Sequence, residues 1–547
     1  MNNKIILLFF LMFNFSYSNQ QEINREERRK QEKEVRELEK YNTQEEVQLH
    51  KIEKKAPKSV KKLRMVFIDG NTILEYKKIE KIKNKHLMKK DGGSIINLMK
   101  DLENAYLKKG YISVRVKINT EKSNLQDGVV YLKVIEGVLE DIQFKDKRNR
   151  GRLKIFTSFP VSKGNILNIN DLDQGIDNLN SVSSNNAKLD ILPGKSLGGS
   201  IIEIDNQKFK RVSGTINYNN LGQDFTGKDR VKLSLMFEDI LGVNDSFMVS
   251  YQQKLGWEID EDNDDFSFFF KIPVKYWEFS ISRSQSEYLS AIESFNHIYE
   301  STGVSTNINY SVRRIVNRNS KGKTSIGMTL TEKDTKNYFD GIKLITGSRK
   351  LSILKTDLNH NRRFLGGILS GNLAYHEGLD RFGAKSDEDN GVFSPKAQFQ
   401  KYTANLNWYK PFVIKKQNLL YRFTFSGQYT DDILYSSESM NIGDDTTIRG
   451  FRNDSSSGDK GFYLRNELGY RYTFFEPFIG YDYGRVKSVF KDEYYKKSGD
   501  KMSGATIGVK VYLNYFDMSL SYSKPLTAPS YIEKNTHELY FTTSIKF

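Results

Sequence analysis

The sequence has no cysteine, nine prolines and six histidines among its 547 residues. Without cysteine, disulfides and thiolate metal sites are excluded. The histidines show no HExxH or other metal-binding spacing. Asp260, Asp262 and Asp264 begin like a calcium loop, but Asp265 stands where that loop needs glycine. We interpret this run as an acidic hairpin loop and expect no metal, no cofactor and no catalytic group, so the protein is not expected to be an enzyme.

Long hydrophobic runs are also missing after the N-terminus, and the mean hydropathy is −0.59. Residues 1–18 resemble a signal peptide, with Lys4 before an apolar core and small residues at Ser16 and Ser18. This stretch is shorter than the ~20 apolar residues of a membrane-spanning helix. We therefore expect an exported protein, and one that can span a membrane only as a closed barrel.

The net charge of +16 does not indicate a nucleic-acid-binding protein. Lysine and arginine are spread along the chain among 68 acidic residues, with no long basic tail and no zinc knuckle. The 13% of aromatic residues instead suits a transmembrane barrel, in which every second strand residue faces lipid.

Three regions precede the barrel. Residues 19–40 are highly charged, lack glycine and proline, and predict a helix that is polar on all sides, suited to a solvated or charge-lined space. Residues 41–63 read as a linker. Residues 64–140 and 141–206 each mix strand and helix patterns, which predicts two small α/β modules in tandem.

From residue 207 to residue 547 apolar and polar residues alternate with a period of two, as in Leu539 to Phe547. A soluble β-sandwich also alternates, but the number of strands and the loop lengths favour an outer-membrane barrel. We predict sixteen antiparallel strands, with tight turns near Lys275 and Pro411 and long loops such as 287–302 and 334–349. The candidate strands begin near residues 209, 228, 244, 264, 276, 303, 321, 350, 367, 396, 416, 461, 475, 502, 515 and 536.

Several motifs follow one another along the chain. LMKDLENAYLKKGYISVRVKI begins at Leu98, and a second module runs from Phe159 to Asp205. NYNNLGQDFTGKDR opens the barrel, and IRGF at Ile448 is followed by GYDYG at Gly480. Together these motifs resemble the haemolysin activation and secretion family of two-partner secretion transporters. The first two are similar to the family's two polypeptide-transport-associated (POTRA) domains, and the third is similar to its first barrel hairpin. The resemblance covers essentially the whole mature chain.

Asp482 lies in a period-two strand, where a carboxylate on the lipid face would be costly, so we predict that it faces the lumen. The resemblance implies that the long loop near 431–460 folds into the barrel and sets Arg449 against Asp482, with Phe451 against the inner wall. A guanidinium can bind a carboxylate through two parallel hydrogen bonds. It further implies that the helix at 19–40 occupies the pore. The candidate functional residues are Ile448, Arg449, Gly450, Phe451, Gly480, Asp482 and Gly484.

The resemblance implies an outer-membrane transporter with periplasmic modules that exports a large exoprotein of the haemolysin or adhesin type, carrying an N-terminal secretion domain. We expect contact with outer-membrane lipid, a monomeric barrel and no nucleic acid. One alternative is an assembly factor of the same superfamily, which usually carries more periplasmic modules. A second is a passive porin or adhesin, which would keep its function after deletion of residues 65–205.

Overall fold

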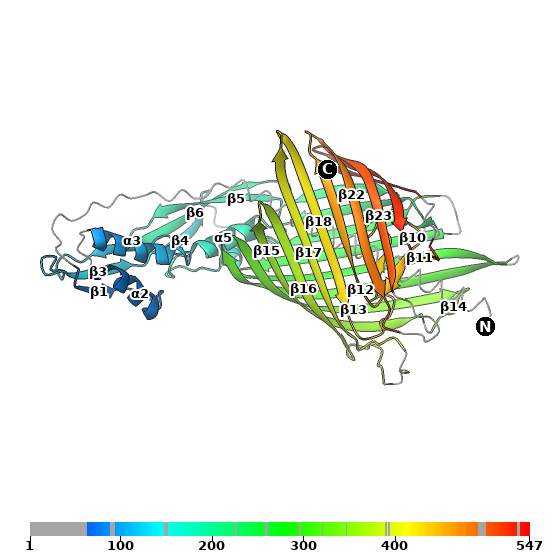
Figure 1. Cartoon of the computed structure of the whole chain (residues 1–547), viewed down its shortest axis with the longest axis horizontal. Coiled ribbons are helices and arrows are strands. Elements are labelled where there is room, and N and C mark those ends of the chain that lie inside the picture. Colours follow the sequence, from blue (N-terminus) through cyan, green and yellow to red (C-terminus); the bar gives the residue numbers. More distant parts are fainter. Residues whose placement is uncertain are drawn as a thin grey trace.

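The structure is a computed structural model that describes residues 63–87, 93–146, 151–224, 227–256, 261–294, 297–319, 321–345, 347–388, 391, 394–490, 499–532 and 537–547. The predicted signal peptide (1–18), the charged helix (19–40) and the linker (41–63, apart from Leu63) lie outside the described residues and stay predictions. Figure 1 shows the two small modules in line at one end of the molecule and the barrel at the other.

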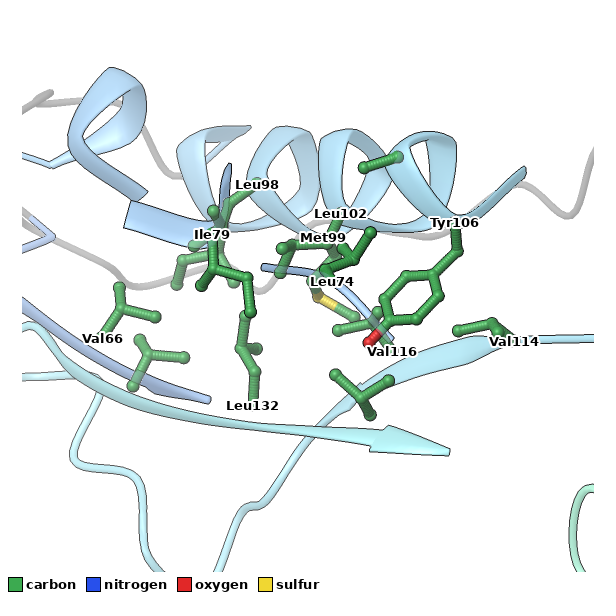
Figure 2. Close-up of a cluster of buried hydrophobic side chains, with 14 of the residues drawn as sticks. Val66, Leu74, Ile79, Leu98, Met99, Leu102, Tyr106, Val114, Val116 and Leu132 are labelled. Carbon is green, nitrogen blue, oxygen red and sulfur yellow. The ribbon is translucent and has the colours of Figure 1, made fainter. Parts of the chain in front are cut away.

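The first module is a three-stranded sheet packed against helices. Strand β3 lies in the centre, parallel to β1 and antiparallel to β2. Leu98, Leu102 and Tyr106 share one face of α3 because they recur at helical spacing, and they point onto Val116 and Leu132 of the sheet (Figure 2). The elements are β1 (Met65–Asp69), α2 (Tyr76–His86), α3 (Gly93–Leu107), β2 (Arg115–Ile118) and β3 (Val129–Ile135).

The second module repeats this plan with β6 between β4 and β5. Helix α5 begins where the Asn168 side chain accepts a hydrogen bond from the Asn170 amide at 2.9 Å, as expected for an N-cap. Gly175 on α5 leaves room for Phe159, whose ring lies 2.1 Å from where a β-carbon would stand. The elements are β4 (Val138–Phe144), α4 (Arg152–Ser158), α5 (Ile169–Leu179), β5 (Asn185–Pro193) and β6 (Gly199–Lys208).

Helices α2 and α4 were not predicted from the sequence. The apolar stripe of α2 consists of Ile79 and Ile82 in a lysine-rich segment. Helix α4 is only seven residues long. Both patterns are too short for periodicity to separate them from a loop.

The sixteen-strand antiparallel barrel is confirmed, and it closes by pairing its last strand, β25, with its first, β7. Closure leaves no sheet edge in the membrane, where unpaired backbone groups would be costly. The strands are β7 (Val212–Asn219), β8 (Arg230–Glu238), β9 (Ser246–Lys254), β10 (Glu261–Val274), β11 (Trp277–Ser294), β12 (His297–Asn319), β13 (Gly322–Phe339), β15 (Arg349–Phe364), β16 (Gly367–Leu379), β17 (Gln400–Ile414), β18 (Gln417–Tyr429), β21 (Lys460–Tyr470), β22 (Phe475–Lys487), β23 (Asp500–Tyr512), β24 (Phe516–Thr527) and β25 (Glu538–Lys546). A two-residue piece, β14 (Ile342–Lys343), extends the pairing of β13.

Some predicted turns and loops are strand in the structure. The predicted turn near Pro411 lies inside β17, and the chain reverses at Lys415 and Lys416, both with positive φ. The predicted loops at 287–302 and 334–349 are largely taken up by long β11, β12 and β13. Asp262 and Asp264, predicted in an acidic hairpin loop, are strand residues of β10. These polar strands lack the apolar alternation that marks a lipid-facing segment.

The second module is joined to the barrel by polar contacts with turns at one rim. Lys154 Nζ of α4 lies 2.5 Å from Asp239 Oδ2, and both side chains are buried. Tyr276 donates a hydrogen bond of 2.5 Å to Asp171 of α5. Burial lowers the pKa of Lys154, and the ion pair with Asp239 opposes that shift. Further contacts are Asn178 Nδ2 to the Lys275 carbonyl, Arg318 to Asp177 and Asn244 to Ser158.

Among the residues that the structure describes, no helix is both long and apolar enough to cross a membrane.

Candidate functional site

The loop between β18 and β21, residues 430–459, carries a small hairpin of β19 (Met440–Ile442) and β20 (Ser456–Gly458). Its tip lies inside the barrel and not in solvent. Ile448, Arg449 and Phe451 are 0%, 4% and 1% exposed. Since a loop tip in solvent would leave such side chains exposed, this burial shows that the barrel wall covers them.

The tip is held in shape by its own hydrogen bonds before it meets the wall. One carboxylate oxygen of Asp444 accepts from the amides of Thr446 and Thr447, at 2.7 and 2.6 Å, and from both hydroxyls. Gly450 has φ +105°, a conformation open to glycine, and a β-carbon there would lie 2.8 Å from the Pro525 nitrogen. The loop therefore presents Arg449 from a preformed turn.

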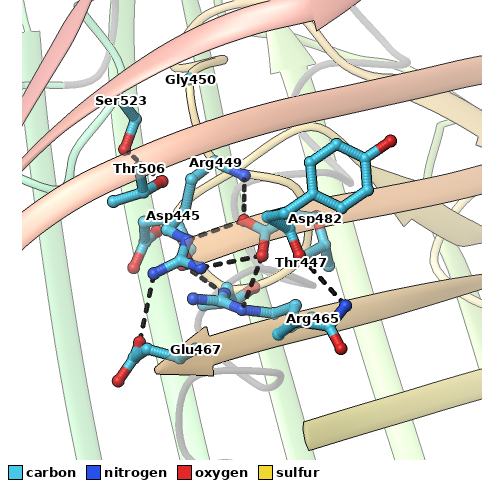
Figure 3. A network of polar contacts seen from close by, with 12 residues as sticks. Asp445, Thr447, Arg449, Gly450, Arg465, Glu467, Asp482, Thr506 and Ser523 are labelled. Atoms are coloured by element: carbon cyan, nitrogen blue, oxygen red, sulfur yellow. Dashed lines mark hydrogen bonds and ion pairs between the residues drawn. The ribbon is translucent and has the colours of Figure 1, made fainter. Parts of the chain in front are cut away.

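The structure brings Arg449 and Asp482 together (Figure 3). Arg449 Nε lies 2.7 Å from Asp482 Oδ2, and Nη2 lies 2.8 Å from Oδ1. The Arg449 amide also donates to Oδ2, at 3.1 Å. The guanidinium thus binds the carboxylate through two parallel bonds, an arrangement that lysine cannot reproduce.

A second carboxylate completes the site and was missed by sequence reasoning. Glu467 of β21 accepts from Arg449 Nη1 at 3.2 Å and from Arg422 Nη1 at 3.0 Å, and it also contacts Lys510. Arg465 pairs in register with Asp482 and lies 4.0 Å from its carboxylate. Arg465 and Glu467 have the same strand parity, so alternation was the signal that could have placed both in the lumen.

The predicted glycines clear the space that the loop fills. A β-carbon on Gly480 would lie 2.4 Å from Arg449 Nη2, and one on Gly484 would lie 2.8 Å from Ile448 Cδ1. Gly504 of β23, which the sequence did not single out, is tighter still, with the Arg449 carbonyl oxygen 2.0 Å from its would-be β-carbon. Small residues on three wall positions therefore decide how closely the loop can approach.

Apolar contacts hold the other face of the tip. Ile448 and Phe451 belong to one buried cluster, and the Phe451 carbonyl accepts a hydrogen bond from Tyr540 at 3.2 Å. The cluster also contains Met440, Ile442, Val486, Met502 and Ile532. The arrangement combines a buried ion-pair network with a hydrophobic anchor, and it holds a loop inside a pore.

In the part of the chain that the structure describes, no group of three or more histidine or acidic side chains is placed to hold a metal ion.

Comparison with known proteins matches the whole architecture. Residues 198–511 match the family described as haemolysin secretion/activation protein ShlB/FhaC/HecB. Residues 62–137 match the ShlB-type POTRA domain, and residues 138–193 match a POTRA domain.

The similar proteins include several that are named as transporters. The outer membrane transporter CdiB of Dickeya dadantii is 30% identical over 460 residues, covering 83% of this chain and 80% of that protein. The hemolysin transporter protein HpmB of Proteus mirabilis is 31% identical over 431 residues, covering 78% and 75%. The solved structure of CdiB from Escherichia coli superposes with a TM-score of 0.87 at 24% identity, covering 97% of this chain and 98% of that one.

Proposed function

We propose that this chain, which belongs to the haemolysin secretion/activation protein family, exports a large secreted partner across the outer membrane by two-partner secretion. Two POTRA domains followed by a sixteen-strand barrel are the architecture that such a transporter needs. The observation that carries the proposal is the loop held inside the lumen through Arg449, Asp482 and Glu467. A passive pore has no need of two periplasmic modules docked at its rim, so the lumen loop and the modules together favour a transporter.

The partner class follows from the relatives. Proteins named hemolysin transporter and CdiB are among them, so the partner of this chain is proposed to be a large exoprotein of the haemolysin type. The exoprotein is proposed to cross unfolded, as an extended chain that passes the lumen loop. An N-terminal secretion domain would let the periplasmic modules recognise it.

The periplasmic modules offer strand edges for such a chain. In the described part of the second module, β5 pairs with β6 alone, so its outer edge is open. Ile191 and Leu192 of β5 are 38% and 39% exposed. An extended segment that adds to this edge would bind through main-chain hydrogen bonds with little regard for its own sequence. This suits a transporter that must accept successive segments of one long chain.

The outward face and the closed sheet support two further proposals. Ile479, Tyr481 and Ile507 are each about half exposed on the wall whose inner face carries the buried Asp482, and apolar side chains there suit contact with outer-membrane lipid. Because every barrel strand is paired on both sides, the barrel needs no second copy to satisfy its edges, and it is proposed to act as a monomer.

Export with Arg449→Ala and Asp482→Ala tests the proposal. Each change removes the bidentate ion pair that holds the loop against the barrel wall. Secretion of the partner is therefore expected to fall at least tenfold. The measurement is the amount of partner in the medium, normalised to the amount of heat-modifiable barrel in the outer membrane. Arg381→Ala, in an exposed loop, is the matched control and should export normally. Normal export by both lumen variants at equal barrel levels would contradict the proposed role of the contact.

A further inference from the structure

The loop tip does more than reach Asp482, because it runs across the wall from one strand to the next. Ile448 lies on Gly484 of β22, and the Arg449 carbonyl lies on Gly504 of β23. Gly450 lies on Pro525 of β24. Phe451 then meets Tyr540 of β25. We call residues 448–453 the strap.

The next residue carries the strap over the junction between the last strand and the first. Arg452 Nε donates to Glu538 Oε2 at 2.6 Å, and Nη2 donates to the Leu539 carbonyl at 3.0 Å, both in β25. Its Nη1 contacts the carbonyls of Asn220 and Gly222, just after the end of β7. The strands are neighbours in the order β22, β23, β24, β25, β7.

The strap is not an extended chain, because Arg449 and Gly450 form a turn and Arg452 and Asn453 form a bend. It is anchored at one end by the Arg449 side chain on β22 and at the other by the Arg452 side chain on β25.

The closing junction needs support at this end. Strands β25 and β7 pair in register over Thr215–Asn219 and Thr542–Lys546, the shortest pairing between full strands in the described part of the barrel. Beyond it, Asn220 continues the contact with its side chain, which donates to the Leu539 carbonyl at 2.9 Å and accepts from the Phe541 amide at 2.7 Å. We call this junction the seam.

Arg452 supplies what the seam lacks at that end. Where regular pairing stops, a single guanidinium with five donors reaches the carbonyls of Asn220, Gly222 and Leu539, and it shares the Leu539 carbonyl with the Asn220 side chain. The side chain is 2% exposed and stacks 5.3 Å from the Tyr540 ring centre. Asn453 adds a second bridge, since it donates to Asp224 at 2.8 Å and accepts from the Asp224 amide at 3.0 Å.

We propose that Arg452, assisted by Asn453, is a positioning residue that holds the loop-side end of the barrel seam closed. The lumen loop then holds the last and first barrel strands together as well as occupying the pore. When the strap leaves the lumen, Arg452 leaves the seam with it, so opening of the channel and loosening of the seam are coupled. This inference concerns the barrel alone and does not depend on the identity of an exported partner.

Hydrogen exchange on the full chain, folded in detergent or in lipid nanodiscs, tests the seam directly. In Arg452→Ala, amides at 214–220 and 538–542 are expected to exchange at least ~10-fold faster than in the wild type, because several charge-assisted bonds across the seam are lost. Amides of β11 and β12, on another part of the wall, should keep their rates. Arg381→Ala is the control for loss of an arginine and should leave the seam unchanged.

A disulfide across the seam distinguishes a local effect of Arg452 on the seam from a general loss of barrel structure. The chain has no cysteine, and Asn217 Nδ2 lies 2.8 Å from Ser544 Oγ across the seam. A disulfide between Asn217→Cys and Ser544→Cys should restore slow seam exchange in Arg452→Ala, and reduction with dithiothreitol should abolish the rescue. Damage elsewhere in the barrel would not respond to this tether.

If Arg452→Ala does not fold, hydrogen exchange is measured on Glu538→Gln. This variant weakens one Arg452 contact and leaves the backbone carbonyls in place. It should speed exchange at the same amides by a smaller factor. The proposal is overturned if a folded Arg452→Ala, or Glu538→Gln in its stead, shows wild-type seam exchange. It is equally overturned if the faster exchange is spread over the whole barrel and the disulfide does not reverse it.

Discussion

The main-chain carbonyl of Arg449 occupies the space in which a side chain on Gly504 would begin, with 2.0 Å between the Arg449 oxygen and a β-carbon at residue 504. Two segments that are 55 residues apart in sequence therefore compete for the same space. The wall position must stay a glycine for the loop to reach Asp482, whatever the residues of the loop itself.

Gly504→Ala is accordingly expected to displace the loop from the lumen without breaking the barrel. Overpacking of this kind costs ~1–3 kcal/mol, and a backbone oxygen cannot move aside as a flexible side chain can. Conductance in planar bilayers should rise because the pore is less obstructed. Gly371→Ala is the matched control, since a β-carbon there meets its nearest neighbour at 3.5 Å. Equal conductance of the two variants would show that the close approach does not hold the loop.

Glu467→Gln is expected to lower the stability of the barrel by more than the removal of a surface charge does. Glu467 is 6% exposed and accepts from Arg422, Arg449 and Lys510, so its loss leaves buried cations short of an anion. Breaking a buried pair in this way costs about 3–5 kcal/mol. The measurement is the temperature at which the folded band disappears in heat-modifiability gels.

The control for Glu467 is Glu278→Gln, whose partner Lys271 lies 3.9 Å away and whose side chain is 42% exposed. Exposed pairs contribute about 0–1 kcal/mol. Equal shifts in the two variants would mean that the Glu467 network adds nothing beyond an ordinary surface pair.

The joint between the second module and the barrel should depend on the Lys154–Asp239 pair. Both groups are buried, and burial lowers the pKa of Lys154, so the Lys154 charge without Asp239 would be unfavourable. Asp239 keeps a second partner, because Arg211 Nη2 lies 3.4 Å from its carboxylate. Asp239→Asn alone should therefore loosen the module by about 3–5 kcal/mol, Lys154→Met should loosen it less, and the double variant should recover part of the loss. Distances between spin labels on the module and the barrel would report the loosening. Additive effects in the double variant would rule out a direct coupling.

The second module should also lose stability in acid through Glu140. Hydrogen bonds from the Ser196 hydroxyl and from the amides of Lys195 and Ser196 lower the pKa of this carboxyl to about 2. A lowered pKa means that the folded state favours the charged form, so the contribution is present above about pH 4.5 and is lost as the pH falls toward 2.

The measurement for Glu140 is the thermal midpoint of residues 63–208, whose two modules each have a buried core. Glu140→Gln should be less stable than the wild type near pH 7, and the difference should shrink as the pH falls from about 4.5 to about 2. A difference that stays constant over this range would show that the charge of Glu140 is not involved.

The sequence by itself determined the barrel, its sixteen strands and the lumen side of Asp482. Strand periodicity is local, because alternate residues must face lipid or water whichever neighbours they have. The sequence also placed the IRGF loop beside Asp482, though only through resemblance to a family and not through periodicity. Periodicity predicted the strand ends poorly where strands extend into solvent, as in β11 to β13. Both faces of a strand are polar there, so the alternation disappears.

Tertiary structure alone decided the contacts that hold the site. Gly504 and Arg452 carry no local signal, and alternation gives only the lumen side of Glu467, because each acts through a partner from a distant strand or loop. The joint through Lys154 and the seam under Arg452 likewise exist only once the modules dock and the barrel closes. Residue order determines which face of a strand a side chain takes, whereas closure of the sheet determines which loop it meets there.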